Sequence, residues 1–443
     1  MELISQSAVE GRPGPVYQEA YPRITGLQFN DAKTFVRGQP FGAFASLRES
    51  APVCWHAESG DLPGFWVVTR HADVMRVNAD PGTFSSRRGG ILMNTPKPGT
   101  GHVLLGRASF DTMINLDAPQ HLQLRREHMP FFTPAYLNTL KAKVAAEVTR
   151  LIDVMAQKGE CDLVETFSSR LPLYTLCEIL GVPAADRPKF LQWMHYLELA
   201  QNLAADQAVE PIAPTVELMQ FVADFNSNVE EMFAYGLHML HKRRKDPQAD
   251  LMTAIARAQV DGEMLSDEYL DGSWLLIVFA GNDTTRNTLS GAMKLLTEFP
   301  EEKVKLAAHP ELLGNAADEF IRMVSPVIYM RRTALRDTEI ADQKIAEGEK
   351  VVMYYGAANR DASVFDRADT LDVARPNANK HIAFGYGPHV CLGKRVAQIQ
   401  LEEAYRQLLV RLPDIEWTGE IDIAPNNFVH AIRKLGVRFT ATT

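Results

Sequence analysis

The sequence predicts a mainly α-helical fold with a smaller β-rich region. Two observations predict the helices: a periodicity of about 3.6 residues dominates from Pro119 to about Lys245, and a second helical pattern runs from Asp267 to Glu298. A third observation predicts the β-rich region, because the segments 338–355 and 413–443 alternate short β-prone runs with turn residues.

In the N-terminal part, residues 1–20 carry Pro and Gly and predict a loose arm. The run from Phe65 to Thr69 reads as a strand, and a short helix follows it. Residues 84–115 are rich in Gly, Ser, Pro and Thr, which predicts a long loop region, and such loops in compact enzymes are usually functional. Breaks in the helical pattern are expected near Gly159 and at Gly181–Pro183.

The central helix is expected to begin at Ser266 and Asp267 and to end at Glu298, before Pro300. At 1.5 Å per residue its length is roughly 50 Å, which is typical of a core element. Residues 356–383 read as weakly structured, and residues 394–411 return to a helical pattern.

Composition excludes several classes of protein. The 443 residues are 46% hydrophobic, so the chain can bury a large core, and 46 basic against 55 acidic residues give a net charge of −9, which argues against a nucleic-acid partner. The start lacks the pattern of a secretory signal, and the most apolar run, "WLLIVFAG" at 274–281, stops at Asn282 and Asp283, so no membrane anchor is expected. Four scattered cysteines do not make a disulfide framework. We expect a soluble, cytoplasmic enzyme.

The run "FGYGPHVCLG", Phe384 to Gly393, surrounds Cys391 with glycines. Glycines allow tight turns and let backbone N–H groups approach a sulfur atom. The helix expected just after Cys391 places positive N-terminal amides near it, which favours a thiolate. A buried cysteine in a glycine loop is the simpler interpretation of an isolated cysteine. The full pattern Phe-Gly-x-Gly-x-His-x-Cys-x-Gly, however, fits at each defined position: Phe384, Gly385, Gly387, His389, Cys391 and Gly393.

This run resembles the haem-binding signature of the cytochrome P450 monooxygenases. The resemblance covers most of the chain, from about residue 60 to the end, and implies one P450 domain over 1–443 without membrane anchor or fused reductase. It implies a haem b cofactor whose iron is bound by Cys391. The motif order and the C-terminal third look most like soluble bacterial members that hydroxylate terpenoids and alkyl-aromatics.

The segment "AGNDTTRN" in the central helix resembles the oxygen-activating segment of the same family. A threonine in mid-helix often only bonds back to the preceding turn. The resemblance implies that Ala280 and Gly281 leave room above the haem for dioxygen. It also implies that Asp283 and Thr284 deliver protons to the bound oxygen, a task for which a carboxyl and a hydroxyl are suited.

Glu319 and Arg322 form a Glu-x-x-Arg pair, which alone is a common surface pattern. Its place between the central helix and the cysteine run resembles the family's buried structural pair, with Arg375 as the expected third partner. The match around Arg375 departs from the family, because Ala368 and Leu371 stand where Pro and Phe are frequent, and Pro376 follows in place of an aromatic residue.

The haem propionates require cations. His121 and Arg125 fall at i, i+4 after Asp117 and Pro119, so they share one helix face, which spacing alone would equally assign to a solvated basic surface. Their resemblance to the family's propionate-binding residues favours the haem. Arg332, with Arg331 as the alternative, and His389 complete the expected set.

Apolar segments predict the walls of the substrate pocket: the loop at 84–115, the helices near 190–225, the run 274–279 and the run 327–330, with the turn at 426–430 closing it. Core packing would equally explain the run 274–279. Within the walls we expect Phe279, Val327, Ile328, Tyr329 and Phe428, with Tyr329 and Asn427 as polar anchors. The basic residues Arg87, Arg88 and Lys97 are expected to face water, so no anchor for a carboxylate is predicted.

The resemblance implies hydroxylation of an unactivated C–H bond with O2 and two electrons from an external iron–sulfur ferredoxin and its reductase. We expect a monomer whose basic residues receive the ferredoxin: Arg126, His128, Lys394 and Arg395. The substrate is expected to be a compact terpenoid or alkyl-aromatic; a steroid or fatty-acid hydroxylase is the alternative. A haem-thiolate ligand or gas sensor without turnover and a peroxide-driven enzyme remain as further alternatives, although neither would need the Asp283–Thr284 pair.

Overall fold

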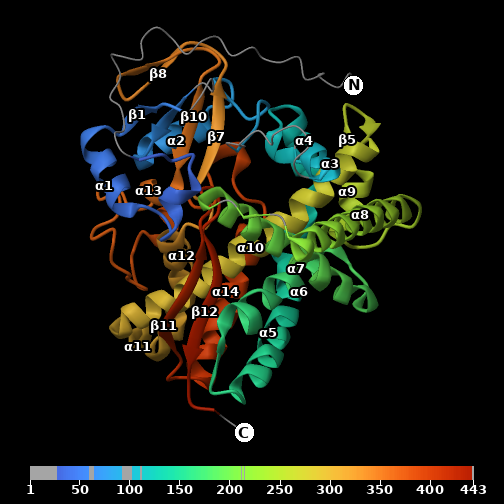
Figure 1. The fold of residues 1–443 in the computed structure, drawn as a ribbon, viewed down its shortest axis with the longest axis vertical. Helices are drawn as coiled ribbons and strands as arrows, with labels where there is room; N and C mark the ends of the chain where they lie inside the picture. The colour runs from blue at the N-terminus through green and yellow to red at the C-terminus, as the bar shows by residue number, and fades with distance from the viewer. Residues whose placement is uncertain are drawn as a thin grey trace.

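The computed structural model describes residues 27–58, 64–91, 102–109, 112–210, 212–213 and 215–441. The expected N-terminal arm therefore lies outside the described residues. Helices dominate, and the strands gather mainly at two places (Figure 1). None of the described helices is long and apolar enough to span a bilayer.

The helices are α1 Phe41–Ser50, α2 His71–Ala79, α3 Val103–Ala108, α4 Gln120–His128, α5 Pro134–Ala156, α6 Arg170–Leu180, α7 Arg187–Val209, α8 Val216–Lys245, α9 Leu251–Arg257, α10 Asp267–Glu298, α11 Pro300–Ala308, α12 Leu313–Val324, α13 Tyr355–Ala358 and α14 Lys394–Arg411. The strands are β1 Val53–His56, β2 Phe65–Val68, β3 Phe84–Ser85, β4 Glu160–Asp162, β5 Gln259–Val260, β6 Glu263–Met264, β7 Tyr329–Ala334, β8 Thr338–Ile340, β9 Gln343–Ile345, β10 Lys350–Tyr354, β11 Glu416–Ala424 and β12 Ala431–Arg438.

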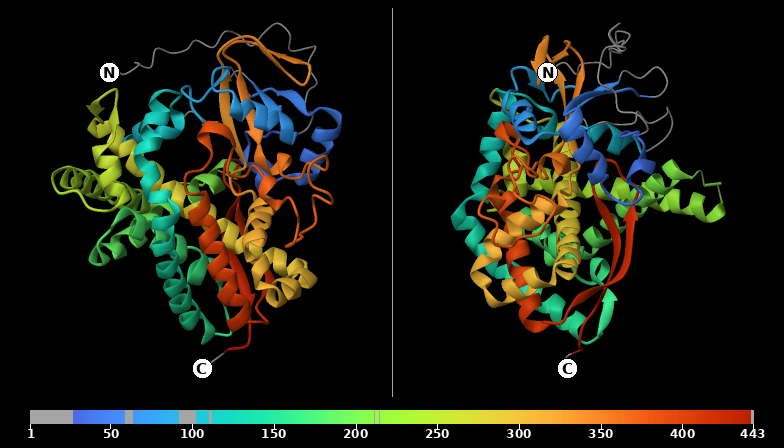
Figure 2. Two further views of the ribbon diagram at one scale, coloured as in Figure 1. Left: turned by 180° about the vertical axis from the view of Figure 1, so that it is seen from behind. Right: turned by 90° about the vertical axis from the view of Figure 1, so that its left-hand side faces the viewer.

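Helix α10 forms the central axis of the molecule (Figures 1 and 2). Ser266 occupies its N-cap position with acidic residues in the first turn, which suits the positive end of the helix dipole. It ends at Glu298, where Pro300 starts α11. The buried apolar residues of α6, α8, α12 and α14 pack around it in one cluster, which α5 joins through its contacts with α6 and α14. Tyr405 of α14 also donates a hydrogen bond to the carbonyl of Leu289 at 2.6 Å.

A five-stranded sheet, in the order β1-β2-β10-β7-β3, lies beside this helical layer. Its side chains alternate between two buried clusters: in β2, Trp66 and Val68 join one cluster, while Phe65 and Val67 join the other. Both faces of the sheet are therefore covered. The antiparallel pair β11–β12 forms a second sheet with β4 near the C-terminus.

The predicted fold class is confirmed, as are the strand at residues 65–69, the central helix and the helix at 394–411. The segment 84–115 differs from the prediction, because its described part holds β3, α3 and a 3-10 turn at Met113–Asn115. The expected breaks occur at Gly159 and Gly181, which adopt φ of 74° and 70°. The segment 338–355 divides into the β8–β9 hairpin and β10, which joins the larger sheet.

Candidate functional site

The cysteine loop, Phe384 to Gly393, lies between the sheet region and α14 and turns tightly on its glycines. The Cys391 amide donates to the Phe384 carbonyl at 2.8 Å, which closes the loop. Gly387 has φ of 70°, and a β-carbon there would lie 2.7 Å from the carbonyl oxygen of Asn78 in α2. A side chain is therefore excluded both by the left-handed backbone and by the close approach of α2.

Several donors approach the sulfur of Cys391. Burial raises the pKa of the Cys391 thiol, while the backbone N–H groups of Gly393 and Lys394 and the Arg125 cation lower it. Helix α14 begins at Lys394, so its N-terminal amides point toward the sulfur. These groups favour the thiolate, the form in which cysteine binds a metal.

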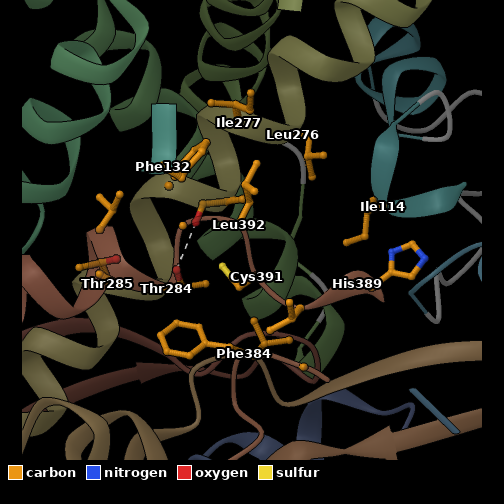
Figure 3. A pocket seen from close by; sticks show the side chains of 18 of the residues that line it. Ile114, Phe132, Leu276, Ile277, Thr284, Thr285, Phe384, His389, Cys391 and Leu392 are labelled. Carbon is orange, nitrogen blue, oxygen red and sulfur yellow. Dashed lines mark hydrogen bonds between the residues drawn. The ribbon is translucent and has the colours of Figure 1, made fainter. Parts of the chain in front are cut away.

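A cavity of about 340 Å³ lies between the cysteine loop and α10. Cys391 lines this cavity (Figure 3). One face of α10 lines it at helical spacing, with Ser273, Leu276, Ile277, Ala280, Gly281, Thr284, Thr285 and Thr288. The cysteine loop and α10, about 100 residues apart in the chain, thus share one cavity.

The face of α10 that lines the cavity carries only small residues at positions 280 and 281, Ala280 and Gly281. A β-carbon at Gly281 would lie 3.2 Å from the Leu176 side chain of α6, so that side chain would have to shift slightly to admit it. The Thr284 hydroxyl donates to the carbonyl of Ala280 at 3.1 Å (Figure 3). Asp283 does not line the cavity; its carboxylate accepts a hydrogen bond from Asn282 at 3.2 Å and lies 3.6 Å from Arg286.

Four basic side chains lie together in the lining: His121 and Arg125 of α4, Arg332 of β7, and His389 of the cysteine loop. The rings of His121 and His389 stack with centroids 3.9 Å apart. Burial, with the neighbouring arginines, lowers the pKa of His121 to about 4 and that of His389 to about 3. Among the described residues, no carboxylate forms an ion pair with Arg125 or Arg332. Such a cluster calls for an anionic ligand.

The comparisons with known proteins decide the family. A family model, Cytochrome P450, matches residues 49–412. The chain is a cytochrome P450. Linalool 8-monooxygenase of Pseudomonas putida is 34% identical over 90% of this chain and 95% of its own length. Cytochrome P450-terp of a Pseudomonas species is 31% identical over 90% and 93%. The solved structure of a Mycobacterium marinum cytochrome P450 in complex with pseudoionone matches with a TM-score of 0.83 and 33% identity, over 94% of this chain and 99% of that one.

Cytochromes P450 are monooxygenases that bind haem b through a cysteine thiolate. The residues present here fit that group. The Cys391 thiol, which two backbone N–H donors and the Arg125 cation stabilise as a thiolate, faces the cavity. The basic cluster beside it has no carboxylate ion-pair partner among the described residues, as two propionates would require. Cys391 would hold the iron, and Arg125, Arg332, His121 and His389 would hold the propionates. Arg331 does not line the cavity.

The remaining cofactor contacts expected from the sequence come from the cysteine loop and α10. Phe384, Gly393, Ala280 and Gly281 all line the same cavity as Cys391. Ser86 supports His389, because its hydroxyl lies 3.3 Å from the ring Nε2. The Asp117 carboxylate accepts a hydrogen bond from the Ser86 amide at 2.9 Å and so holds Ser86 in place.

The P450 fold is held beneath the cysteine loop by a buried ion-pair cluster. Glu319 accepts from Arg322 at 2.7 and 2.8 Å and from Arg375 at 2.9 Å, and both Glu319 and Arg322 are fully buried. Arg322 also donates to the carbonyl of Ala368 at 2.7 Å. Because this contact uses the backbone, the departure of the sequence from the family at position 368 leaves it intact.

The substrate-pocket residues expected from the sequence divide into two groups. Val327 lines the cavity. Ile328 and Tyr329 instead pack into the buried cluster on the far face of the sheet, and Phe428 lies against Tyr329 with ring centroids 5.5 Å apart. Phe279 packs against the helical core. These four side chains are therefore not part of the cavity lining.

The expected segments also contribute differently. No described residue of 190–225 lines the cavity, and neither does Asn427. Arg87 and Arg88 are exposed, as expected, while Lys97 lies outside the described residues. Met113 and Ile114 of the segment 84–115 and Met330 of the run 327–330 line the cavity, as the sequence predicts. The lining that the sequence did not indicate is mostly apolar: Phe132, Pro172, Leu176, Ile179, Leu251 and Ile321. Leu276 and Ile277 line the cavity as well, and they belong to the apolar run 274–279 that the sequence predicts as a pocket wall.

Proposed function

We propose that this cytochrome P450 hydroxylates an unactivated C–H bond of a compact apolar molecule, a terpenoid or alkyl-aromatic, with electrons from an external ferredoxin. The observation that carries the proposal is the apolar lining opposite Cys391, from Ile114 and Leu176 to Leu276, Ile277 and Val327. The overall reaction is R–H + O2 + 2 e⁻ + 2 H⁺ → R–OH + H2O. When bound, the haem supplies the activation of oxygen.

The protein supplies shape and protons. Thr284 gives up its bond to the Ala280 carbonyl and donates to the oxygen side of the cavity, and Asp283, behind it, restores the proton. The apolar face of α10 holds the substrate by contact area rather than by charge. The relatives support this assignment, because linalool 8-monooxygenase and a pseudoionone-bound P450 bear names of small terpenoid-type molecules.

Steroids and lipids are the second candidate class. Steroid C26-monooxygenase of Mycolicibacterium smegmatis is 31% identical, and methyl-branched lipid omega-hydroxylase of Mycobacterium tuberculosis is 33% identical. A fatty acid would need a cation for its carboxylate. Apart from the four basic residues that would hold the propionates and His128, the described lining contains only apolar and uncharged polar residues, so the lining favours an uncharged ligand.

The substrate proposal is tested by the spin-state shift that accompanies displacement of water from the haem. Purified enzyme is titrated side by side with monocyclic terpenes, p-alkyl-aromatics, steroids and long-chain fatty acids. We expect saturable shifts with the first two groups and product formation on turnover. Tight binding of a steroid or fatty acid, with none of the compact hydrocarbons, would replace the proposal with the second candidate; binding without any product would favour a sensor.

The residue roles have separate tests. Cys391→Ser should abolish the strongly red-shifted Soret band of the reduced carbon monoxide complex, while Ser at Cys54, Cys161 or Cys177 should keep it. Thr284→Ala should bind substrate and consume reductant but divert it to peroxide. Full coupling of reductant to product in Thr284→Ala would remove the proposed role of this hydroxyl.

Fewer basic side chains are available to bind a ferredoxin than the sequence predicts. His128 is buried and lines the cavity, so it is not part of an exposed basic surface. Arg395 is ion-paired with Glu402 at 2.5 Å. Arg126 is exposed and Lys394 half-buried, and within the described residues neither forms an ion pair. A positive patch steers an acidic partner electrostatically.

The charge-reversed double variant Arg126→Glu/Lys394→Glu should slow reduction by a ferredoxin at low salt while leaving substrate binding unchanged. Lys344→Glu serves as the control, because Lys344 is exposed on the β8–β9 hairpin, far from α14 (Figure 1). Equal reduction rates in both variants would exclude the patch.

A further inference from the structure

Helix α7 reaches α10 through an ion pair that includes the neighbour of Asp283. Arg286 of α10 lies 2.6 Å from Glu198 of α7 through its Nη1, and 3.6 Å from Asp283 through its Nη2. One cation thus lies between two carboxylates from different helices. The shorter distance shows that Glu198 is its principal partner.

The guanidinium of Arg286 is buried but loosely bonded. Its side chain is 4% exposed, against 15% for Asp283 and 28% for Glu198. Neither Nε nor Nη1 of Arg286 makes a well-directed hydrogen bond to any described residue, although Nη1 is close to Glu198. Buried donors without a directed hydrogen bond are rare in native structures, so these two nitrogens of Arg286 call for an explanation.

We propose that Glu198 and Arg286 are positioning residues for Asp283, and that Glu198 draws Arg286 away so that the Asp283 carboxylate can turn toward Thr284. This inference rests on the proposed proton role of Asp283. With Glu198 ionised, the attraction of the cation is shared and Asp283 is held weakly. Without the Glu198 charge, Arg286 is left with Asp283 alone, and a close buried ion pair would fix that carboxylate away from the cavity.

The ion pair between Glu198 and Arg286 also connects the proposed proton role of Asp283 with the position of α7. A second ion pair fastens the same helix: Asp206 accepts from Arg433 of β12 at 2.8 Å, two helical turns beyond Glu198. Asp206 has no contact with Asp283 or Arg286. The two carboxylates of α7 therefore separate an effect on Asp283 from an effect on the position of the helix.

The experiment compares Glu198→Gln with the matched control Asp206→Asn in the haem-loaded enzyme with a bound substrate. The measured quantities are the decay rate of the oxygenated enzyme, its solvent deuterium isotope effect, the fraction of reductant recovered as product, and substrate affinity from the spin-state shift. We expect Glu198→Gln to slow decay about tenfold and to raise the isotope effect. This is less than the roughly 10²–10⁴-fold that a proton-transfer group itself contributes, because Glu198 acts only through Asp283. Substrate affinity should change less than about twofold, because neither carboxylate lines the cavity.

Asp206→Asn should leave decay and isotope effect unchanged. Equal slowing in both variants would assign the effect to the seating of α7 and overturn the proposal, as would unchanged decay in Glu198→Gln. A second comparison uses Asp283→Asn as background. If Asp283→Asn alone slows decay, Glu198→Gln should add nothing to it, since Glu198 acts through Asp283. Independent, additive slowing also overturns the proposal, whereas no effect of Asp283→Asn refutes the proton role on which it rests.

Discussion

The two walls of the cavity are built in different ways. The cysteine wall is fixed by backbone: Gly387 fits against α2, the Cys391 amide is bonded to Phe384, and the Glu319 cluster is fully buried beneath. The α10 wall is a regular helix face whose functional side chains are held by single contacts, such as the 3.1 Å bond from Thr284 to Ala280.

This difference predicts how each wall responds to substitution. Changes in the cysteine wall remove backbone or ion-pair interactions that nothing else replaces, so they should cost stability. Changes on the α10 face leave the helix hydrogen bonds in place, so they should cost coupling of electrons to product while the fold remains stable.

The largest expected effect is that of Glu319→Gln. The amide cannot neutralise the buried cations of Arg322 and Arg375, so the free energy of unfolding should fall by about 4 kcal/mol. Glu147→Gln is the control, because Glu147 binds Arg150 at the same i, i+3 spacing, at 2.6 and 2.8 Å, with an arginine that is 58% exposed. It should cost less than about 1 kcal/mol. Equal losses in denaturant unfolding would show that burial does not distinguish the two pairs.

A smaller loss is expected for Gly387→Ala. The left-handed backbone costs an alanine roughly 1 kcal/mol, and relief of the 2.7 Å contact with Asn78 adds about 2 kcal/mol. Gly262→Ala separates the two causes, since Gly262 has φ of 85° but no heavy atom within 4 Å of a β-carbon. Gly262→Ala should lose only the roughly 1 kcal/mol that the left-handed backbone costs. If both variants unfold at the same denaturant concentration, the close approach of α2 has no energetic weight.

A third prediction concerns the apoprotein at acid pH. Burial lowers the pKa of His128 to about 4, so the folded protein favours its neutral form more than the unfolded chain does. The contribution of His128 to the free energy of unfolding is fully present above about pH 6.5. It falls by up to about 1.4 kcal/mol per pH unit as the pH is lowered from 6.5 to 4. His128→Gln should reduce the dependence of unfolding free energy on pH in that window. An identical pH dependence in both proteins would contradict the stated burial effect.

The cysteine wall was more predictable from the sequence than the cavity as a whole. Phe384 to Gly393 are contiguous, and His121 with Arg125, like Glu319 with Arg322, are paired by helical spacing, so local pattern brings each set together. The side chains of Ile328 and Tyr329 could not be placed, because their direction depends on pairing in the sheet. The contact between Glu198 and Arg286 depends on how α7 packs against α10, which no local pattern specifies.

The smallest expected effect is a gain in stability, so its sign is opposite to that of the losses expected in the cysteine wall. Thr284→Ala removes a β-branched residue from the middle of α10 and should raise the free energy of unfolding by up to about 0.5 kcal/mol, since alanine favours helix more than threonine does. Thr297→Ala is the control, because Thr297 makes the same bond to the carbonyl four residues before it, at 3.0 Å, but its hydroxyl also accepts from Trp417, so its removal should destabilise. A loss of stability in Thr284→Ala would mean that this hydroxyl supports the fold as well as the chemistry. The α10 wall would then resemble the cysteine wall.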